Sequence, residues 1–335
     1  MTPELAQYKK ISDAELISAL LSATASRETA TQFWRSVTDY PNLLLREGNV
    51  AQAQVLLLNL LDKCCSQAPQ DYSKIHKGSP YYWLAIAAFL MHDFQTAEFF
   101  LDATITEDLQ WGANVDKNAT PAMSFLLLEA SQLNPNAQRL AQAAEAKLQL
   151  CVEFYKSLAG KPAWLPDLSL PRLRLRFLRP ALSSNNPSWR RLAVSLISFL
   201  LEWDFRKELH PLRVTDGTFE PFYLHLLKGC VLFEGLLNEN PKKKPVGGDL
   251  AAVVSELQAE LGISPPANLS GRLNDLLGDL DQADNRIETA VVFTLRLRKA
   301  VSQASGEGET VSLVQYRQLF EMVASAGLYA LACLY

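Results

Sequence analysis

Residues 219–237 have the sequence FEPFYLHLLKGCVLFEGLL, and their apolar side chains recur in alternating steps of four and three. The series consists of Phe219, Tyr223, Leu226, Cys230, Phe233 and Leu237. Because an α-helix completes a turn in 3.6 residues, these steps align the six side chains on one helical face. The pattern predicts a long amphipathic helix that packs against other helices along its whole length.

Helical spacing also dominates the rest of the chain. Three further apolar stripes consist of Leu140, Ala144, Leu148, Cys151 and Tyr155; of Trp189, Leu192, Leu196, Phe199 and Trp203; and of Tyr316, Phe320, Val323, Gly327, Ala330 and Leu334. Strand-like alternation occurs only in the RLRLRF run at 172–177, and a single run cannot form a sheet. We therefore expect an all-α protein.

Cap residues indicate where several helices begin. Ser12 and Glu15 form a capping box, in which the serine accepts from a free N–H and the glutamate reaches back. Ser79-Pro80 and Thr120-Pro121 each place a cap residue before a proline, which is tolerated at the first helical position. We expect helices to begin at these three places.

Prolines divide the chain into two helical parts. Pro162, Pro166, Pro171, Pro180 and Pro187 are too many for one uninterrupted helix. We expect a helical N-terminal domain over 1–160, a Pro/Arg-rich linker over 161–187 and a C-terminal helical bundle over 188–335. Two polar stretches, at 238–249 and 305–310, predict further loops.

The N-terminal part contains an incomplete repeat. Tyr81, Leu84, Ala85, Ala97 and Leu101 have the spacing of a tetratricopeptide unit, in which small residues let two antiparallel helices touch. An upstream segment with Ala53, Leu57 and Leu60 resembles the second helix of another such unit. The resemblance implies an array of antiparallel helical hairpins, although any pair of helices with small residues at the crossing would show this spacing.

Composition and motifs exclude several classes of protein. With 32 basic and 36 acidic residues the formal charge is -4, so affinity for nucleic acid would have to be local. The odd count of five cysteines, without a CxxC pair, and the start without a signal-peptide pattern favour a reducing cytoplasm. No apolar stretch reaches the ~20 residues of a membrane span. The four histidines lack metal-ligand spacing and no phosphate-binding loop occurs, so we expect neither metal nor cofactor.

A basic tract is the most unusual local composition. It lies within 168–201, contains no acidic residue, and consists of Arg172, Arg174, Arg176, Arg179, Arg190 and Arg191. Guanidinium groups hold phosphate or carboxylate at two points, and Phe177 and Trp189 are close enough in sequence to stack on a base. The tract predicts a surface for RNA or an acidic protein partner, unless these arginines pair with carboxylates elsewhere in the fold.

The last 60 residues resemble the C-terminal part of HEPN-type helical bundle proteins. The resemblance lies in a helix that ends FTLRLRKAVSQ at 293–303, a polar loop, and a long closing helix. Active members use an arginine, a polar residue and a histidine to cut RNA without metal, usually across a dimer. Arg298 matches the arginine, but Lys299 stands where asparagine is common and Gln303 where the histidine belongs.

This departure favours binding over catalysis. Glutamine cannot transfer a proton near neutral pH as imidazole does. We therefore expect a non-catalytic binding or regulatory protein that engages a protein partner, with RNA as a further ligand and a homodimer through the C-terminal bundle left open. The alternatives are a metal-independent ribonuclease or toxin-like effector, in which His225 or His210 serves Arg298, and a structural subunit of a larger assembly.

Overall fold

The computed structural model describes residues 12–24, 26–111, 120–159, 168–212, 219–239, 262–263, 272–280, 282–303 and 310–335. Every regular element within these residues is helical, apart from one isolated bridge between Ala159 and Arg286. The all-α prediction is therefore confirmed. None of the described helices is long and apolar enough to cross a membrane.

The chain forms two compact units, an N-terminal unit of residues 1–142 and a C-terminal unit of 143–335. The division lies within α9 (Pro135–Ser157), upstream of the proline-rich segment. Residues 160–167 of that segment and most of the predicted loops at 238–249 and 305–310 lie outside the described residues.

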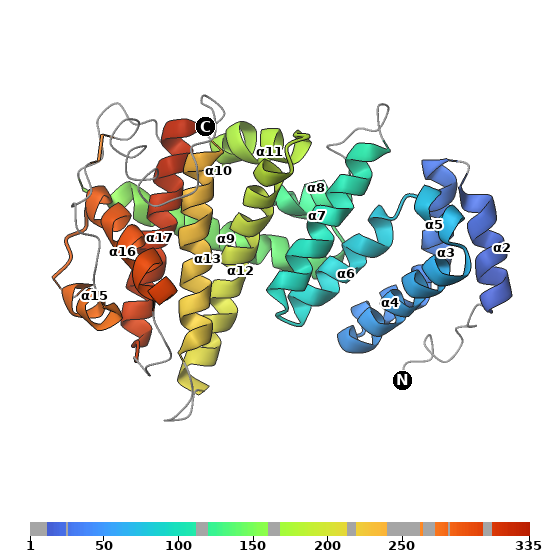
Figure 1. The fold of residues 1–335 in the computed structure, drawn as a ribbon, viewed down its shortest axis with the longest axis horizontal. Coiled ribbons are helices and arrows are strands. Elements are labelled where there is room, and N and C mark those ends of the chain that lie inside the picture. The colour runs from blue at the N-terminus through green and yellow to red at the C-terminus, as the bar shows by residue number, and fades with distance from the viewer. Residues whose placement is uncertain are drawn as a thin grey trace. The chain divides into compact units, whose positions relative to one another are not determined.

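Helical hairpins build the N-terminal unit (Figure 1). The helix α2 (Asp13–Ala23) packs on α3 (Arg27–Arg46), which pairs with α4 (Val50–Gln67), and α6 (Gly78–Leu90) pairs with α7 (Phe94–Gln110). Short helices α5 (Pro69–Lys74) and α8 (Pro121–Leu126), and the 3-10 turn η2 (Ala130–Gln132), connect the longer ones. Ala53, Ala85 and Ala97 are fully buried, so small residues lie where the helices approach.

Two of the three predicted helix starts are confirmed. Ser12 and Glu15 form the expected capping box, and the Thr120 hydroxyl accepts from the Met123 N–H. At the third place a helix does begin, but one residue earlier, at Gly78, so the prediction that Ser79 caps it is wrong. The N–H of the preceding residue, Lys77, donates to a carboxylate of α7 at 2.9 Å, which a local cap pattern cannot reveal.

Four long helices form the core of the C-terminal unit. The helix α13 (Glu220–Asn238) packs against α12 (Pro187–Leu209), α16 (Ile287–Gln303) and α17 (Leu313–Leu334) (Figure 1). All six residues of its predicted apolar face are buried. Between α12 and α17, the rings of Trp203 and Phe320 stack with their centroids 4.2 Å apart. Shorter elements are η4 (His210–Leu212) and α15 (Leu273–Leu280), which packs on α16 and α17.

The strand-like run at 172–177 is helical. It lies in α10 (Leu170–Leu173) and in η3 (Arg174–Leu178), which is a π-helix, and α11 (Arg179–Ser183) follows. Leu173, Phe177 and Leu178 are buried, whereas Leu175 is 67% exposed. Burial at steps of four and five is helical, so the alternation of arginine and leucine in the sequence does not define the buried face.

Candidate functional site

The arginine that carries the HEPN resemblance is engaged by a carboxylate. Arg298 lies in α16 and is half-buried, and its Nε donates to Glu234 Oε2 of α13 at 3.2 Å. Lys299 is also half-buried. Gln303 ends α16, but its side chain lies outside the described residues. The ion pair explains how a charged side chain is accommodated on the mostly apolar face of α16.

The two histidines considered as partners of Arg298 are held elsewhere. His225 is 1% exposed, and its Nε2 donates to the Phe199 carbonyl at 2.9 Å, since a carbonyl only accepts. Its Nδ1 then accepts from the Tyr316 hydroxyl at 2.6 Å. Burial lowers the pKa of His225 to about 4, against the raising effect of Glu202. The ring is therefore neutral near pH 7.

Helix geometry separates His225 from Glu234, the partner of Arg298. The two residues are nine positions apart on α13, which corresponds to about 13.5 Å along the helix axis. Arg298 contacts Glu234, and no hydrogen bond or ring contact described for His225 involves Arg298. His210, from η4, has its Nε2 2.8 Å from the Val311 carbonyl. Within the described residues of one chain, therefore, neither histidine contacts Arg298.

The arginines of the tract differ in burial and in the partners that they contact. Arg174 donates to Glu145 of α9 at 2.9 Å, and Arg190 is buried with its Nη1 on the Ser184 carbonyl at 3.0 Å. Both arginines therefore have structural partners within the C-terminal unit. Arg172, Arg176 and Arg179 follow one another along α10, η3 and α11, whereas Arg191 is exposed on α12.

Base stacking by Phe177 is excluded in this fold. Phe177 is 1% exposed and packs edge-on against Tyr335, with ring centroids 5.2 Å apart. Trp189 also packs on Tyr335, at 5.9 Å. Both rings therefore pack within the protein. Their closeness to the arginines in the sequence did not indicate that they are available to stack on a base.

An apolar groove lies between α12 and α13 in the C-terminal unit. This α12–α13 groove has a volume of about 410 Å³ and is lined by Arg191, Leu192, Ser195, Leu224, Leu227, Lys228, Val231 and Leu232. Leu224 is 52% exposed and Val231 is 48% exposed. Lys228 donates to Glu202 at 3.2 Å and to Ser198 at 2.8 Å, so its charge is partly neutralised. The groove presents mainly apolar side chains, and Arg191 is among the residues that line it.

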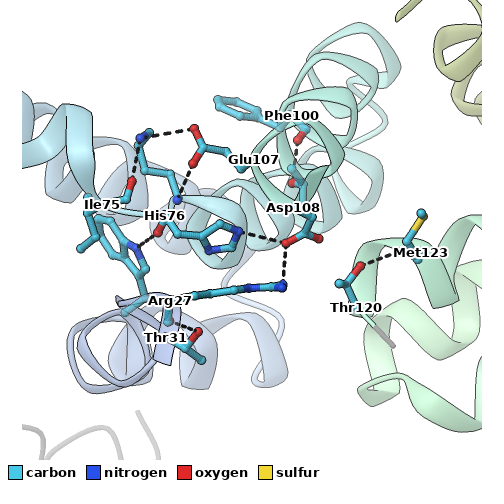
Figure 2. A network of polar contacts seen from close by, with 12 residues as sticks. Arg27, Thr31, Ile75, His76, Phe100, Glu107, Asp108, Thr120 and Met123 are labelled. Carbon is cyan, nitrogen blue, oxygen red and sulfur yellow. Dashed lines mark hydrogen bonds and ion pairs between the residues drawn. The ribbon is translucent and has the colours of Figure 1, made fainter. Parts of the chain in front are cut away.

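In the N-terminal unit, the structure gathers a buried polar cluster that the sequence did not indicate (Figure 2). Asp108, near the end of α7, accepts from Arg27 Nη2 at 2.8 Å and faces His76 Nε2 at 2.9 Å. The Trp34 indole N–H donates to the His76 carbonyl at 2.6 Å. Arg27 begins α3, so the cluster joins the start of one hairpin to the end of another.

A second ion pair lies beside the first. Lys77 Nζ is 3.3 Å from Glu107 Oε1, and its main-chain N–H donates to Glu107 Oε2, so one carboxylate holds the residue twice. A Cβ placed on Gly78 would lie 2.6 Å from the His76 ring. Glycine at this position therefore allows His76 to approach Asp108. Gly78, directly after His76 and Lys77, is the feature of the sequence that could have indicated how closely the His76 ring approaches this helix.

The chemistry of the cluster is chiefly structural. The side chains of His76 and Asp108 are 5% and 7% exposed, so the imidazole and carboxylate are nearly closed to solvent. His76 Nδ1 and Arg27 Nη1 are buried without a hydrogen-bond partner. No group of three metal-ligating side chains occurs in the part of the chain that the structure describes. We therefore regard the α12–α13 groove, not this cluster, as the candidate functional site.

Neither a protein-family model, nor a curated protein, nor a solved structure matches this chain, so its own geometry carries the functional argument.

Proposed function

We propose that this chain is a non-catalytic helical binding protein that holds an amphipathic helix of a protein partner in the α12–α13 groove. The observation that carries the proposal is the exposed apolar row of α13. Leu224, Leu227 and Val231 lie along one face, and two of them expose about half of their surface. Large apolar side chains that gather in a groove are typical of interaction sites.

The spacing of the row suits a helical ligand. Leu224, Leu227 and Val231 are separated by three and four residues, which places them at successive turns of α13. A partner helix with apolar residues at i, i+3 or i+4, and i+7 would place its side chains between those of α12 and α13. The hydrophobic contact would supply the affinity, and the polar rim would set the orientation.

The described lining of the groove includes two basic side chains, Arg191 and Lys228. Lys228 is already paired with Glu202 within the fold. The proposal therefore rests on the apolar row and not on charge.

Three contacts support the non-catalytic part of the proposal. The arginine of the HEPN-like motif, Arg298, is paired with Glu234, and the imidazole of His225 is hydrogen-bonded to Phe199 and to Tyr316. The fold would then have kept the bundle and lost the proton-transferring group. The hairpins of α3, α4, α6 and α7 would serve as a tetratricopeptide-like scaffold.

Affinity capture from the native cell with a matched pair of variants tests the binding site. Val231→Asp places a charge in the groove, whereas Val314→Asp places the same charge on another exposed valine of the C-terminal unit, 67% exposed. We expect one stoichiometric partner to be retained by the wild type and by Val314→Asp and lost with Val231→Asp. Crosslinks from that partner should map to α12 and α13.

Three results would contradict the proposal. Equal capture by both variants would remove the groove as the site. Self-association of the purified chain that Val231→Asp abolishes would assign the groove to a second copy. Cleavage of RNA in EDTA that disappears in Arg298→Ala would restore the enzyme alternative.

A further inference from the structure

A pocket of the N-terminal unit lies where three helices meet. The helices α2, α3 and α4 each pack against the other two, and the pocket between them has a volume of about 220 Å³. Its described lining consists of Asp13, Leu16, Val37, Tyr40, Pro41, Leu56, Asn59, Leu60, Asp62 and Lys63. This α2–α4 pocket shares no described residue with the α12–α13 groove.

The proline inside α3 leaves a main-chain acceptor beside the pocket. Pro41 has no N–H, so the Val37 carbonyl, four residues earlier, lacks the donor that an α-helix normally supplies. That carbonyl points along the helix toward Pro41, and both residues line the pocket. A ligand with a hydrogen-bond donor can therefore replace the missing helical N–H.

Buried apolar side chains from all three helices line the pocket. Leu16 of α2 is 2% exposed and Val37 of α3 is 4% exposed, and Leu60 of α4 is also buried. Tyr40 and Leu56 are half-buried beside them. A ligand that covers these side chains removes apolar surface from water, so its own body should be apolar.

The polar part of the lining has one carboxylate more than its cation can neutralise. Lys63 is the only cation among the described lining residues, and its Nζ lies 2.5 Å from Asp13 Oδ1. Asp62 forms neither an ion pair nor a hydrogen bond with a described residue. The two carboxylates and one ammonium group of the described lining leave Asp62 for a cationic ligand.

Size and chemistry together define the class of ligand. A volume of 220 Å³ equals that of about seven water molecules, so the pocket holds about six or seven non-hydrogen atoms and no helix. An ammonium group has three donors and a positive charge, which suit a carboxylate and a carbonyl without its helical donor. An alkyl chain that carries this group matches the apolar lining.

We infer that the α2–α4 pocket binds a small alkylamine, with its ammonium group at Asp62 and its alkyl chain against Leu16 and Val37. The inference goes beyond the proposed protein partner, because it concerns the other unit of the chain and another class of ligand. Failure of either proposal leaves the other unchanged.

Ligand-observed NMR titration of the full chain with n-pentylamine tests the inference. We expect saturable binding, weakened about threefold to fivefold by Asp62→Asn, because this variant keeps the size of the side chain and removes a partly solvated ion pair. Asp39→Asn removes an exposed carboxylate of α3 that does not line the pocket, and it should bind as the wild type does. The neutral analogue 1-pentanol should bind at least about threefold more weakly than the amine.

A larger side chain at position 56 tests the place of binding. Leu56→Trp fills the pocket and should abolish binding, and circular dichroism shows whether the variant is folded. Asp62→Asn, at an exposed position, keeps the test meaningful if the tryptophan variant is not folded. Equal binding by the wild type and Asp62→Asn would overturn the inference. So would 1-pentanol or pentanoate that binds as tightly as the amine.

Two further measurements exclude other sources of the cation. Residues 1–11 lie outside the described residues and contain Lys9 and Lys10. The double variant Lys9→Ala/Lys10→Ala should bind pentylamine as tightly as the wild type or more tightly, and loss of binding would contradict the inference. Nα-acetyl-lysine methylamide that binds more than about tenfold tighter than pentylamine would assign the pocket to a lysine of a peptide and overturn the small ligand.

Discussion

Asp108 accepts two donors at one oxygen, from Arg27 and from the His76 ring, and its side chain is 7% exposed. A carboxylate buried to this extent is stable only with its partners in place. The two partners come from segments 81 and 32 positions away in the sequence. The position of Asp108 therefore couples the start of α3 and the loop before α6 to the end of α7.

A double-mutant cycle measures this coupling. We expect Asp108→Ala to lower the free energy of unfolding by about 3 kcal/mol, because it strands Arg27 and His76 without their acceptor. Arg27→Ala should cost less, on the order of 1 kcal/mol, since its side chain is 22% exposed and partly solvated. Urea unfolding of both single variants and the double variant gives the interaction energy. Additive effects would show that the pair contributes no coupling.

His225 gives the C-terminal unit a dependence on pH. Burial lowers the pKa of the folded ring to about 4, below the value near 6.5 in the unfolded chain. The unfolded chain therefore binds the proton at a higher pH, and the free energy of unfolding falls by about 3 kcal/mol as the pH drops from about 6.5 to about 4. Above pH 6.5 this contribution is fully present.

Urea midpoints between pH 4 and pH 7.5 test this dependence. His225→Gln should reduce the change of the urea midpoint with pH in that range, whatever its effect on stability at pH 7. Tyr316→Phe removes the donor to Nδ1 but keeps the titrating ring, so its slope should persist. An unchanged slope in His225→Gln would show that other groups cause the dependence.

At the scale of elements, one glycine sets how closely three helices pack. A Cβ on Gly229 of α13 would lie 2.5 Å from Val323 of α17 and 2.7 Å from Phe199 of α12. Both distances are shorter than van der Waals contact, so the Val323 side chain, the Phe199 ring or the helices themselves would have to move. The close approach brings α12, α13 and α17 around the stacked aromatic core.

We expect Gly229→Ala to lower the free energy of unfolding by about 1–3 kcal/mol through overpacking. Gly278 of α15 is the matched control, because a Cβ there meets nothing within 4 Å. Alanine at 278 should raise stability by up to about 1 kcal/mol, as expected for a helical glycine. Urea unfolding of both variants measures the two changes in the free energy of unfolding. If both substitutions lowered it, overpacking at Gly229 would not be the cause.

At the scale of the whole molecule, the free thiols report on burial in both units. Cys64, Cys151 and Cys230 are buried, whereas Cys65 is exposed. Burial raises the pKa of Cys64 to about 11 and of Cys151 to about 12, and it also raises the pKa of Cys230. Because the thiolate is the reactive form, these three thiols should resist alkylation in the native state.

Mass spectrometry after brief treatment with iodoacetamide at pH 8 should find Cys65 modified first and Cys64, Cys151 and Cys230 protected. In urea all five cysteines should react. Rapid native modification of Cys151 or Cys230 would mean that the core of the C-terminal unit opens on the time scale of the reaction.

The sequence determined the helical class and the buried faces of individual helices, because both follow from periodicity over a few residues. The apolar face of α13 was predictable in full, as were the capping box at Ser12 and the cap at Thr120. Only the tertiary structure decided which charges meet. Arg298 pairs with Glu234 across 64 positions, and Arg27 pairs with Asp108 across 81. Such pairs arise from the way distant helices pack, and no local pattern encodes them.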